Sequence, residues 1–141
     1  MTQSRRKGCV GEREVAAIVR DLTGWDVRRR VRQHDGDSDL EGVPGWSVEV
    51  KRRKAAPRGQ IGSWWRQTVE QAGQLLPVLL YRADRDSWRA VWPVGVLLLD
   101  KPDGGWRDIE WTADTTVAAW AAAARTTLRA NGGSKGIGGT K

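Results

Sequence analysis

The clearest structural signal in the chain is a short alternating segment. In residues 46–51, tryptophan and valine alternate with polar side chains, which predicts a strand with one buried face. On the polar face Glu49 and Lys51 are two residues apart, a separation of about 7 Å along a strand. Residues 37–42 predict a second short strand, joined to the first by a turn. This arrangement places Asp39 beside the two charges.

Residues 11–22 show the different spacing of an amphipathic helix, with a stop at Thr23-Gly24. On a helical projection Glu12 lies at the edge of the apolar stripe and faces the body of the fold. A carboxylate in that position must be ligated or paired, although capping of the helix start would also account for it. Glu14 points away and is expected to be an ordinary solvated charge.

The neighbouring segments predict more strands and a second helix. Residues 25–31 alternate as a strand in which arginines lie between apolar positions. Residues 63–73 have helical spacing, with Ser63 as the N-cap and a glycine at the end. Two further strands, residues 77–82 and 87–93, are expected to continue the sheet.

The C-terminal part is expected to add a hairpin and a helix. Residues 94–99 fit either a strand or a short helix, and residues 106–111 fit an edge strand. An alanine-rich helix capped by Thr112 or Asp114 should end before Asn131.

These elements fit one domain. Residues 1–100 form its core and begin with a basic arm over the first ten residues. Residues 101–131 form the hairpin and helix extension. Residues 132–141 are a glycine-rich tail that is expected to be disordered.

The charge of the chain indicates an anionic partner. Its 141 residues carry a formal net charge of +7, and its arginines favour bidentate contact with phosphate, so nucleic acid is the expected partner. The sequence contains no apolar run of the roughly 18 residues that a membrane span needs, and no apolar signal segment. We therefore expect a cytosolic protein that does not bind a membrane. Most of the nine tryptophans are expected in the core and in interfaces.

Residue usage also limits the metal chemistry. The single cysteine, Cys9, excludes an internal disulfide, and the single histidine, His34, argues against a Cys/His zinc site. Any metal must therefore be held by oxygen. The acidic residues 35–39 do not form a calcium loop, because leucine and tryptophan stand where glycine and glutamate are required. No complete phosphate-loop pattern is present, so we expect no nucleotide cofactor.

Carboxylates on adjacent strands beside a lysine suit Mg²⁺, because this ion prefers oxygen ligands and the ammonium group can orient a water next to it. The reaction this indicates is metal-assisted hydrolysis of a phosphodiester. Taken alone, Glu49 and Lys51 would also fit an ordinary solvated strand face, and the rest of the chain favours the catalytic interpretation.

The order of these motifs resembles the PD-(D/E)xK nuclease superfamily, and within it the Holliday junction resolvases of the archaeal type and their relatives in bacterial viruses. The resemblance spans residues 5 to about 93. It implies an α/β, restriction-endonuclease-like αβββαβ core with a mixed central sheet flanked by helices, to which this chain adds a C-terminal helix. The segments that carry it are Arg6-Lys7-Gly8 with Glu12-Arg13-Glu14-Val15, Ser38-Asp39-Leu40, Val48-Glu49-Val50-Lys51, residues 77–82 and Trp88-Arg89.

The resemblance also implies roles for individual residues. Asp39, Glu49 and the main-chain carbonyl of Val50 would ligate Mg²⁺, for which Mn²⁺ would substitute. Glu12 would complete the acidic site through metal or water, and Lys51 would orient or activate the attacking water.

Further residues are candidates for contact with the substrate. Gln67, on the helix predicted for residues 63–73, is a candidate catalytic residue, because it is placed where it could reach the cleft. The family's proline before the aspartate is absent here, and the family's mobile-loop serine corresponds to His34 or Ser38. The expected DNA-binding residues are Arg5, Arg6, Lys7, Arg13, His34, Ser38, Arg52 and Arg53.

The function indicated is a Mg²⁺-dependent endodeoxyribonuclease of the Holliday junction resolvase type, acting on branched double-stranded DNA in the bacterial cytosol. A four-way junction has two related scissile strands, so a two-fold homodimer matches its symmetry. Two alternatives stay open: another nuclease specificity on the same fold (restriction-like, flap or repair), and a basic DNA-binding protein without catalysis.

Overall fold

The structure is a computed structural model that describes residues 3–31, 38–100 and 104–139, with side chains for residues 8–31, 38–100 and 104–130. The chain forms a mixed α/β fold with an element order that begins α, β, β, β, α, β, which confirms the expected fold class. The elements are α1 (Gln3–Thr23), β1 (Arg28–Arg29), β2 (Leu40–Glu41), β3 (Trp46–Arg53), α2 (Arg58–Ala72), β4 (Leu76–Ala83), β5 (Arg89–Pro93), the 3₁₀ helices η1 (Val94–Leu97) and η2 (Ile109–Trp111), β6 (Thr112–Thr116) and α3 (Val117–Gly139).

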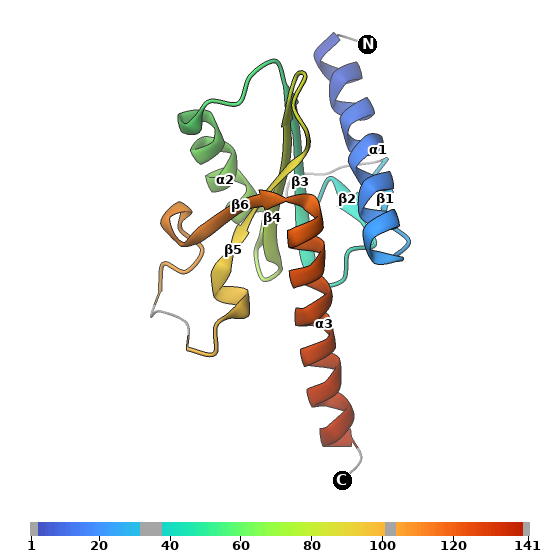
Figure 1. Cartoon of the computed structure of the whole chain (residues 1–141), viewed down its shortest axis with the longest axis vertical. Helices are drawn as coiled ribbons and strands as arrows, with labels where there is room; N and C mark the ends of the chain where they lie inside the picture. Colours follow the sequence, from blue (N-terminus) through green and yellow to red (C-terminus); the bar gives the residue numbers. More distant parts are fainter. Residues whose placement is uncertain (1–2, 32–37, 101–103, 140–141) are drawn as a thin grey trace.

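The main sheet has the strand order β3-β4-β5-β6, so β3 forms one edge (Figure 1). β3 and β4 are parallel, with α2 as their crossover, and the later pairs are antiparallel. β1 and β2 form a separate antiparallel pair. The amide of Asp39 donates to the Val48 carbonyl at 2.8 Å, which fixes this small pair against the edge of the sheet.

Helices cover both faces of the sheet. α1 and α3 pack on the face that carries Val48 and Val50, and α2 packs on the face that carries Leu79 and Tyr81. Tryptophans fill both layers, and six of the nine are buried, which confirms the expected core role for most of them. The six are Trp46, Trp64, Trp65, Trp88, Trp92 and Trp120.

Two helices begin earlier than the sequence predicts. α1 begins at Gln3, so most of the expected basic arm is helical. The helix passes through Gly11, where a Cβ would lie 3.1 Å from Cβ of Arg52, so a small residue is required for the close approach of α1 to β3. α2 begins at Arg58 after Pro57, whose extended backbone starts the helix without a side-chain cap. Ser63 therefore lies inside α2, and its assignment as N-cap is wrong.

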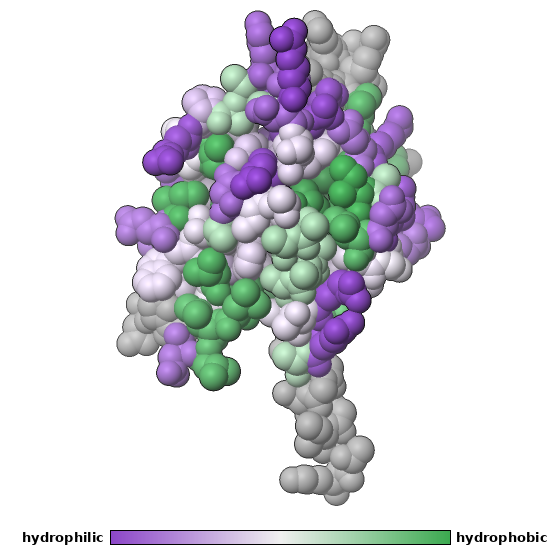
Figure 2. Space-filling view, in the orientation of Figure 1, coloured by the Kyte–Doolittle hydropathy of each residue, from purple (hydrophilic) through white to green (hydrophobic). Residues whose placement is uncertain are grey.

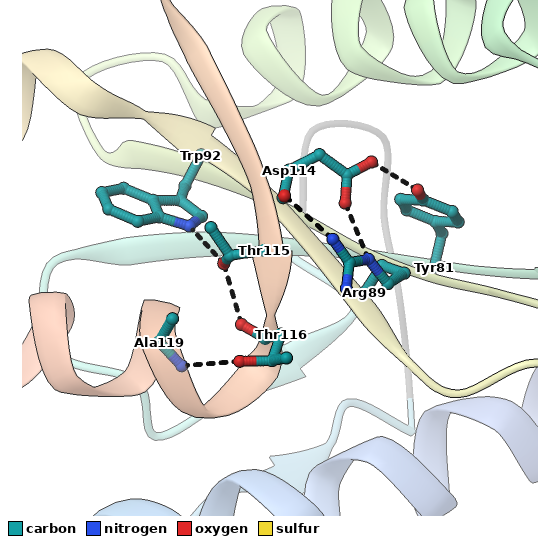
Figure 3. Close-up of polar contacts among 7 residues, drawn as sticks. All are labelled: Tyr81, Arg89, Trp92, Asp114, Thr115, Thr116 and Ala119. Atoms are coloured by element: carbon teal, nitrogen blue, oxygen red, sulfur yellow. Dashed lines mark hydrogen bonds and ion pairs between the residues drawn. The ribbon is translucent and has the colours of Figure 1, made fainter.

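The C-terminal hairpin is displaced along the sequence from its expected position. Residues 109–111 form η2, and the edge strand is β6, which is rich in β-branched threonine. Thr112 and Asp114 therefore lie in a strand, and the Thr116 hydroxyl instead accepts the Ala119 amide at the start of α3 (Figure 3). α3 continues to Gly139, beyond the predicted end before Asn131.

Polar and apolar side chains separate on the surface. In Figure 2 hydrophilic residues gather at the upper end, where Figure 1 shows the β3–α2 connection and the β4–β5 turn. Hydrophobic residues gather at the lower left, and Leu97, Leu98 and Leu99 are exposed in this part of the chain. Within the described residues, no helix is both long enough and apolar enough to cross a lipid bilayer.

Candidate active site

Asp39 and Glu49 meet where the β1–β2 pair lies against the edge of β3. Asp39 immediately precedes β2, and the amide of Val50 donates to its Oδ2 at 2.8 Å. Glu49 projects from the middle of β3 beside it, and the two carboxyls are hydrogen-bonding neighbours. Asp39 is 8% exposed and Glu49 is 7% exposed. Two neighbouring buried carboxylates require a positive partner when both are ionised.

Ser38 explains why Asp39 is held so firmly. Its hydroxyl donates to the Leu40 carbonyl at 2.6 Å and accepts the Val48 amide at 2.8 Å. The side chain is buried and its hydrogen bonds go to the backbone. These hydrogen bonds attach the start of β2 to β3, and the DNA-binding role expected for Ser38 stays a prediction.

The main chain of β3 adds an oxygen on the same side. In a strand, the amide and carbonyl of one residue point to the same neighbour, as Val48 shows by both donating to Ser38 and accepting from Asp39. The Val50 amide points to Asp39, so the Val50 carbonyl is directed to this side as well. The backbone geometry thus agrees with the role expected for Val50.

Lys51 completes the strand face that the alternation predicts. Its Nζ lies 3.4 Å from Glu49 Oε1, and the two side chains are only 13% and 8% exposed. The interpretation of Glu49 and Lys51 as an ordinary solvated strand face is therefore wrong. An ammonium in this position can hold a water or a phosphate oxygen next to the carboxylates.

The electrostatics of the pair favour a bound cation. Burial, assisted by the charge of Glu49, raises the pKa of Asp39 to about 7. Burial also raises the pKa of Glu49, although the neighbouring Lys51 opposes this shift. The two carboxyls therefore retain a proton near neutral pH, and a divalent cation between them would replace that proton.

Glu12 is close to this pair without joining it. Its carboxylate accepts a hydrogen bond from Arg29 Nε at 2.7 Å, while its charge is near enough to raise the pKa of Glu49. Within the part of the chain that the structure describes, no three Asp, Glu, His or Cys side chains converge closely enough to hold a metal ion. In the structure Arg29 binds this third carboxylate, so the role expected for Glu12 at the metal stays a prediction.

The residues present nevertheless fit a hard divalent ion. Mg²⁺ in nucleases is held by one or two carboxylates and completes its shell with water and substrate phosphate. Asp39, Glu49 and the Val50 carbonyl supply such an oxygen set. Burial raises the pKa of Asp39 although the charge of Lys51 opposes this shift, and a bound cation would favour the ionised carboxylate.

Comparison with known proteins agrees with this geometry. A family model described as "Phage putative PDDEXK endonuclease" matches residues 3–117. The chain belongs to this family. The matched span includes every residue of the candidate site and ends at Val117, where α3 begins.

A solved structure shows the same fold. This PD-(D/E)xK endonuclease is similar to Hjc, a Holliday junction resolvase from the archaeal hyperthermophile Archaeoglobus fulgidus, with a TM-score of 0.50 and 19% sequence identity. The match covers 82% of this chain and 96% of that chain. No curated protein matches the endonuclease. PD-(D/E)xK nucleases generally use divalent metals, in agreement with the oxygen set of the site.

The predicted DNA-binding residues have different surroundings. Arg13 and Arg53 are exposed, and the Arg53 guanidinium lies 6.0 Å from the ring of Trp64. Arg52 is half-buried beneath α1. Gln67 lies on the exposed side of α2, so its catalytic role stays a prediction. His34, and the side chains of Arg5, Arg6 and Lys7, lie outside what the structure describes.

Two charged residues of the endonuclease were misjudged or missed. Glu14 is not a free solvated charge, because it pairs with Arg82 and accepts a hydrogen bond from Trp88 Nε1 at 2.7 Å. Arg29 is not among the expected site residues, although a signal is present in the sequence. Arg29 is two residues after Val27 and so shares its face of the strand. Because Val27 is fully buried, a charge on that face requires an acidic partner.

Proposed function

We propose that this endonuclease is a Mg²⁺-dependent, structure-specific enzyme of the Holliday junction resolvase type, which hydrolyses phosphodiester bonds in branched DNA. The observation that carries the proposal is the buried pair Asp39 and Glu49 with Lys51 3.4 Å from Glu49. The resolvase Hjc has the same fold, which supports junctions as the first substrates to test.

The residues of the site have separate roles in the proposed reaction. Asp39, Glu49 and the Val50 carbonyl would hold the cation, which supplies Lewis-acid polarisation of a phosphate oxygen when bound. Lys51 donates to the attacking water and orients it for in-line attack on phosphorus. Burial of the pair keeps bulk water out, so the charges act in a medium of low dielectric constant.

The basic surface would hold the substrate around this site. Arg13 and Arg53 are exposed beside α1 and β3, and arginine binds phosphate through two parallel hydrogen bonds. We extend the proposal to a two-fold homodimer, because the two scissile strands of a four-way junction are related by symmetry. Light scattering in solution tests the dimer. We place the activity in the bacterial cytosol, in recombination or repair of phage DNA.

A cleavage assay with matched substrates tests the specificity. A four-way junction, a flap and a linear duplex of the same sequence are incubated with the protein in Mg²⁺ or in a chelator. We expect Mg²⁺-dependent cleavage of the junction at paired positions. Glu49→Gln should remove cleavage, whereas Glu70→Gln, which changes an exposed carboxylate of α2, should not.

Other results would select the alternatives. Equal cleavage of junction and duplex would replace the resolvase specificity with another nuclease specificity on the same fold. Tight DNA binding without cleavage in Mg²⁺ or Mn²⁺ would indicate a non-catalytic binding protein.

A further inference from the structure

A charged cluster beside the two carboxylates has no role in the function proposed above. Arg29 of β1 donates from Nε to Glu12 Oε2 at 2.7 Å and from Nη2 to Cys9 Sγ at 3.0 Å. The side chains of Arg29 and Glu12 are 21% and 14% exposed. Cys9 and Glu12 are three residues apart in α1 and so lie on one face of the helix. The guanidinium is therefore held by two residues of a single helical turn.

The small β1–β2 pair places this cluster next to the site. Arg29 lies opposite Leu40 in the ladder, and Leu40 follows Asp39. The amide of Arg30 donates to the Asp39 carbonyl at 3.0 Å. The charge of Glu12 reaches Glu49, whose pKa it helps to raise. Arg29 therefore binds a third carboxylate that lies within electrostatic range of Glu49.

This arrangement creates a competition for Glu12. Three neighbouring carboxylates repel each other unless positive charge lies between them. In the structure Lys51 contacts Glu49, and Arg29 contacts Glu12. A divalent cation at Asp39 and Glu49 attracts Glu12 as well. The hydrogen bond from Arg29 Nε to Glu12 Oε2 opposes this movement, because a hydrogen bond between two charged groups is strong.

We infer that Arg29 is a positioning residue that holds Glu12 away from the cation site and thereby lowers the affinity of that site for its metal. The inference rests on the proposed function, because it requires a cation at Asp39 and Glu49. Direct repulsion between Arg29 and the metal ion would also lower the affinity. The inference differs from this explanation because it requires Glu12 to transmit the effect of Arg29.

Titration with Mn²⁺ alone, followed by calorimetry without DNA, measures this effect directly. We expect Arg29→Gln to bind Mn²⁺ about tenfold more tightly than wild type, the effect of one charged hydrogen bond. In a Glu12→Gln background the same change should have no effect, because the group that Arg29 holds has been removed. Arg28→Gln is the matched control, since it removes an equal charge from a neighbouring, 67% exposed side chain. Its affinity should stay within twofold of wild type.

Three results would overturn the inference. The first is unchanged or weaker Mn²⁺ binding by Arg29→Gln. The second is equal tightening in the Glu12→Gln background, which would indicate simple repulsion. The third is tightening of similar size in Arg28→Gln. If wild type itself bound no Mn²⁺, the proposed metal site would fail, which is a distinct result.

Cys9→Ala keeps the test decisive if Arg29→Gln does not fold, as judged by circular dichroism. This variant retains the guanidinium and removes only its contact with Sγ. A weaker hold on Arg29 should tighten Mn²⁺ binding by about twofold to threefold, because a neutral contact contributes less than a charged one. Unchanged affinity in folded Cys9→Ala would count against the inference.

Discussion

Asp39 is central both to the proposed chemistry of the site and to the free energy that burying its carboxyls requires. Its carboxylate is buried, hydrogen-bonded by Val50 and adjacent to Glu49. A surface aspartate would avoid this environment. The site therefore retains a buried pair of carboxyls whose charge Lys51 offsets only in part, which is typical of positions selected for function over stability.

This environment predicts that the stability of the metal-free protein decreases as the pH rises. The pKa of Asp39 is about 7 in the folded state and about 4 in an unfolded chain. The folded state thus binds the proton more tightly, and the stability this group contributes is lost as the pH rises from about 4 to about 7. In a chelator, the melting temperature of wild type should fall between pH 5 and pH 8, and that of Asp39→Asn should fall less.

Added Mg²⁺ provides the control for this prediction. At pH 8 it should raise the melting temperature of wild type and leave that of Asp39→Asn unchanged, because a ligand stabilises only the state that binds it. Parallel pH profiles for the two proteins would show that the carboxyl of Asp39 is not strained by its surroundings.

At the scale of elements, the site depends on how the β1–β2 pair lies against β3. Gly42 directly follows β2 and has a φ of 89°, and a Cβ there would lie 2.2 Å from the Asp26 carbonyl oxygen. This glycine therefore allows the turn to pass close to the chain before β1. The position of Asp39 follows from that contact as well as from its own hydrogen bonds.

Replacing Gly42 should damage the fold far more than replacing a similar glycine nearby. We expect Gly42→Ala to lower the free energy of unfolding by about 3 kcal/mol or more, because backbone strain and a steric clash add. Gly45 also has a positive φ, but a Cβ there would meet nothing within 4 Å, so Gly45→Ala should cost about 1 kcal/mol. Urea denaturation measures both. Equal losses would show that the close approach at Gly42 is unimportant.

The sequence predicts elements best where the signal is local. The alternation over residues 46–51 identifies β3, and with it Glu49 and Lys51, because the strand period fixes which side chains share a face. Prediction from the sequence fails where tertiary contacts determine the environment of a side chain. Glu14 looks solvated on an isolated helix, yet its partners Arg82 and Trp88 are 68 and 74 residues away.

The same limit applies to the third carboxylate and to the element ends. The projection of α1 correctly turns Glu12 toward the fold, but its partner Arg29 is 17 residues away. The sequence therefore could not show that Arg29 binds Glu12. The helix begins earlier than expected because residues 1–10 look like a basic arm in the sequence, whereas Gly11 allows α1 to pass close to β3.

On the surface of the whole molecule, one end is hydrophilic and the other is more hydrophobic (Figure 2). The net charge of +7 attracts any nucleic acid, but exposed arginines near the site should contact the phosphates in the complex. The hydrogen bonds of β6, which include Tyr81 to Asp114 at 2.5 Å and Arg89 to Asp114 at 2.9 Å, hold the far edge of the sheet (Figure 3).

Salt dependence distinguishes local phosphate contacts from overall charge. We expect junction binding to weaken linearly with the logarithm of salt concentration, and Arg53→Ala to reduce that slope by about one. Arg125→Ala removes the same charge from an exposed position on α3 and should leave the slope unchanged. Fluorescence anisotropy over a range of salt concentrations provides the measurement. Equal slopes for the two variants would mean that only net charge matters.

The most direct test of the account is single-turnover cleavage of a junction by Lys51→Ala, with junction binding measured in parallel. Lys54→Ala is the control, since this exposed lysine directly follows β3. If Lys51 orients the attacking water, its removal should slow cleavage by about 100-fold or more and leave binding within a few-fold of wild type. Cleavage by Lys51→Ala at the rate of wild type and of Lys54→Ala would contradict the assignment of this site as the catalytic centre.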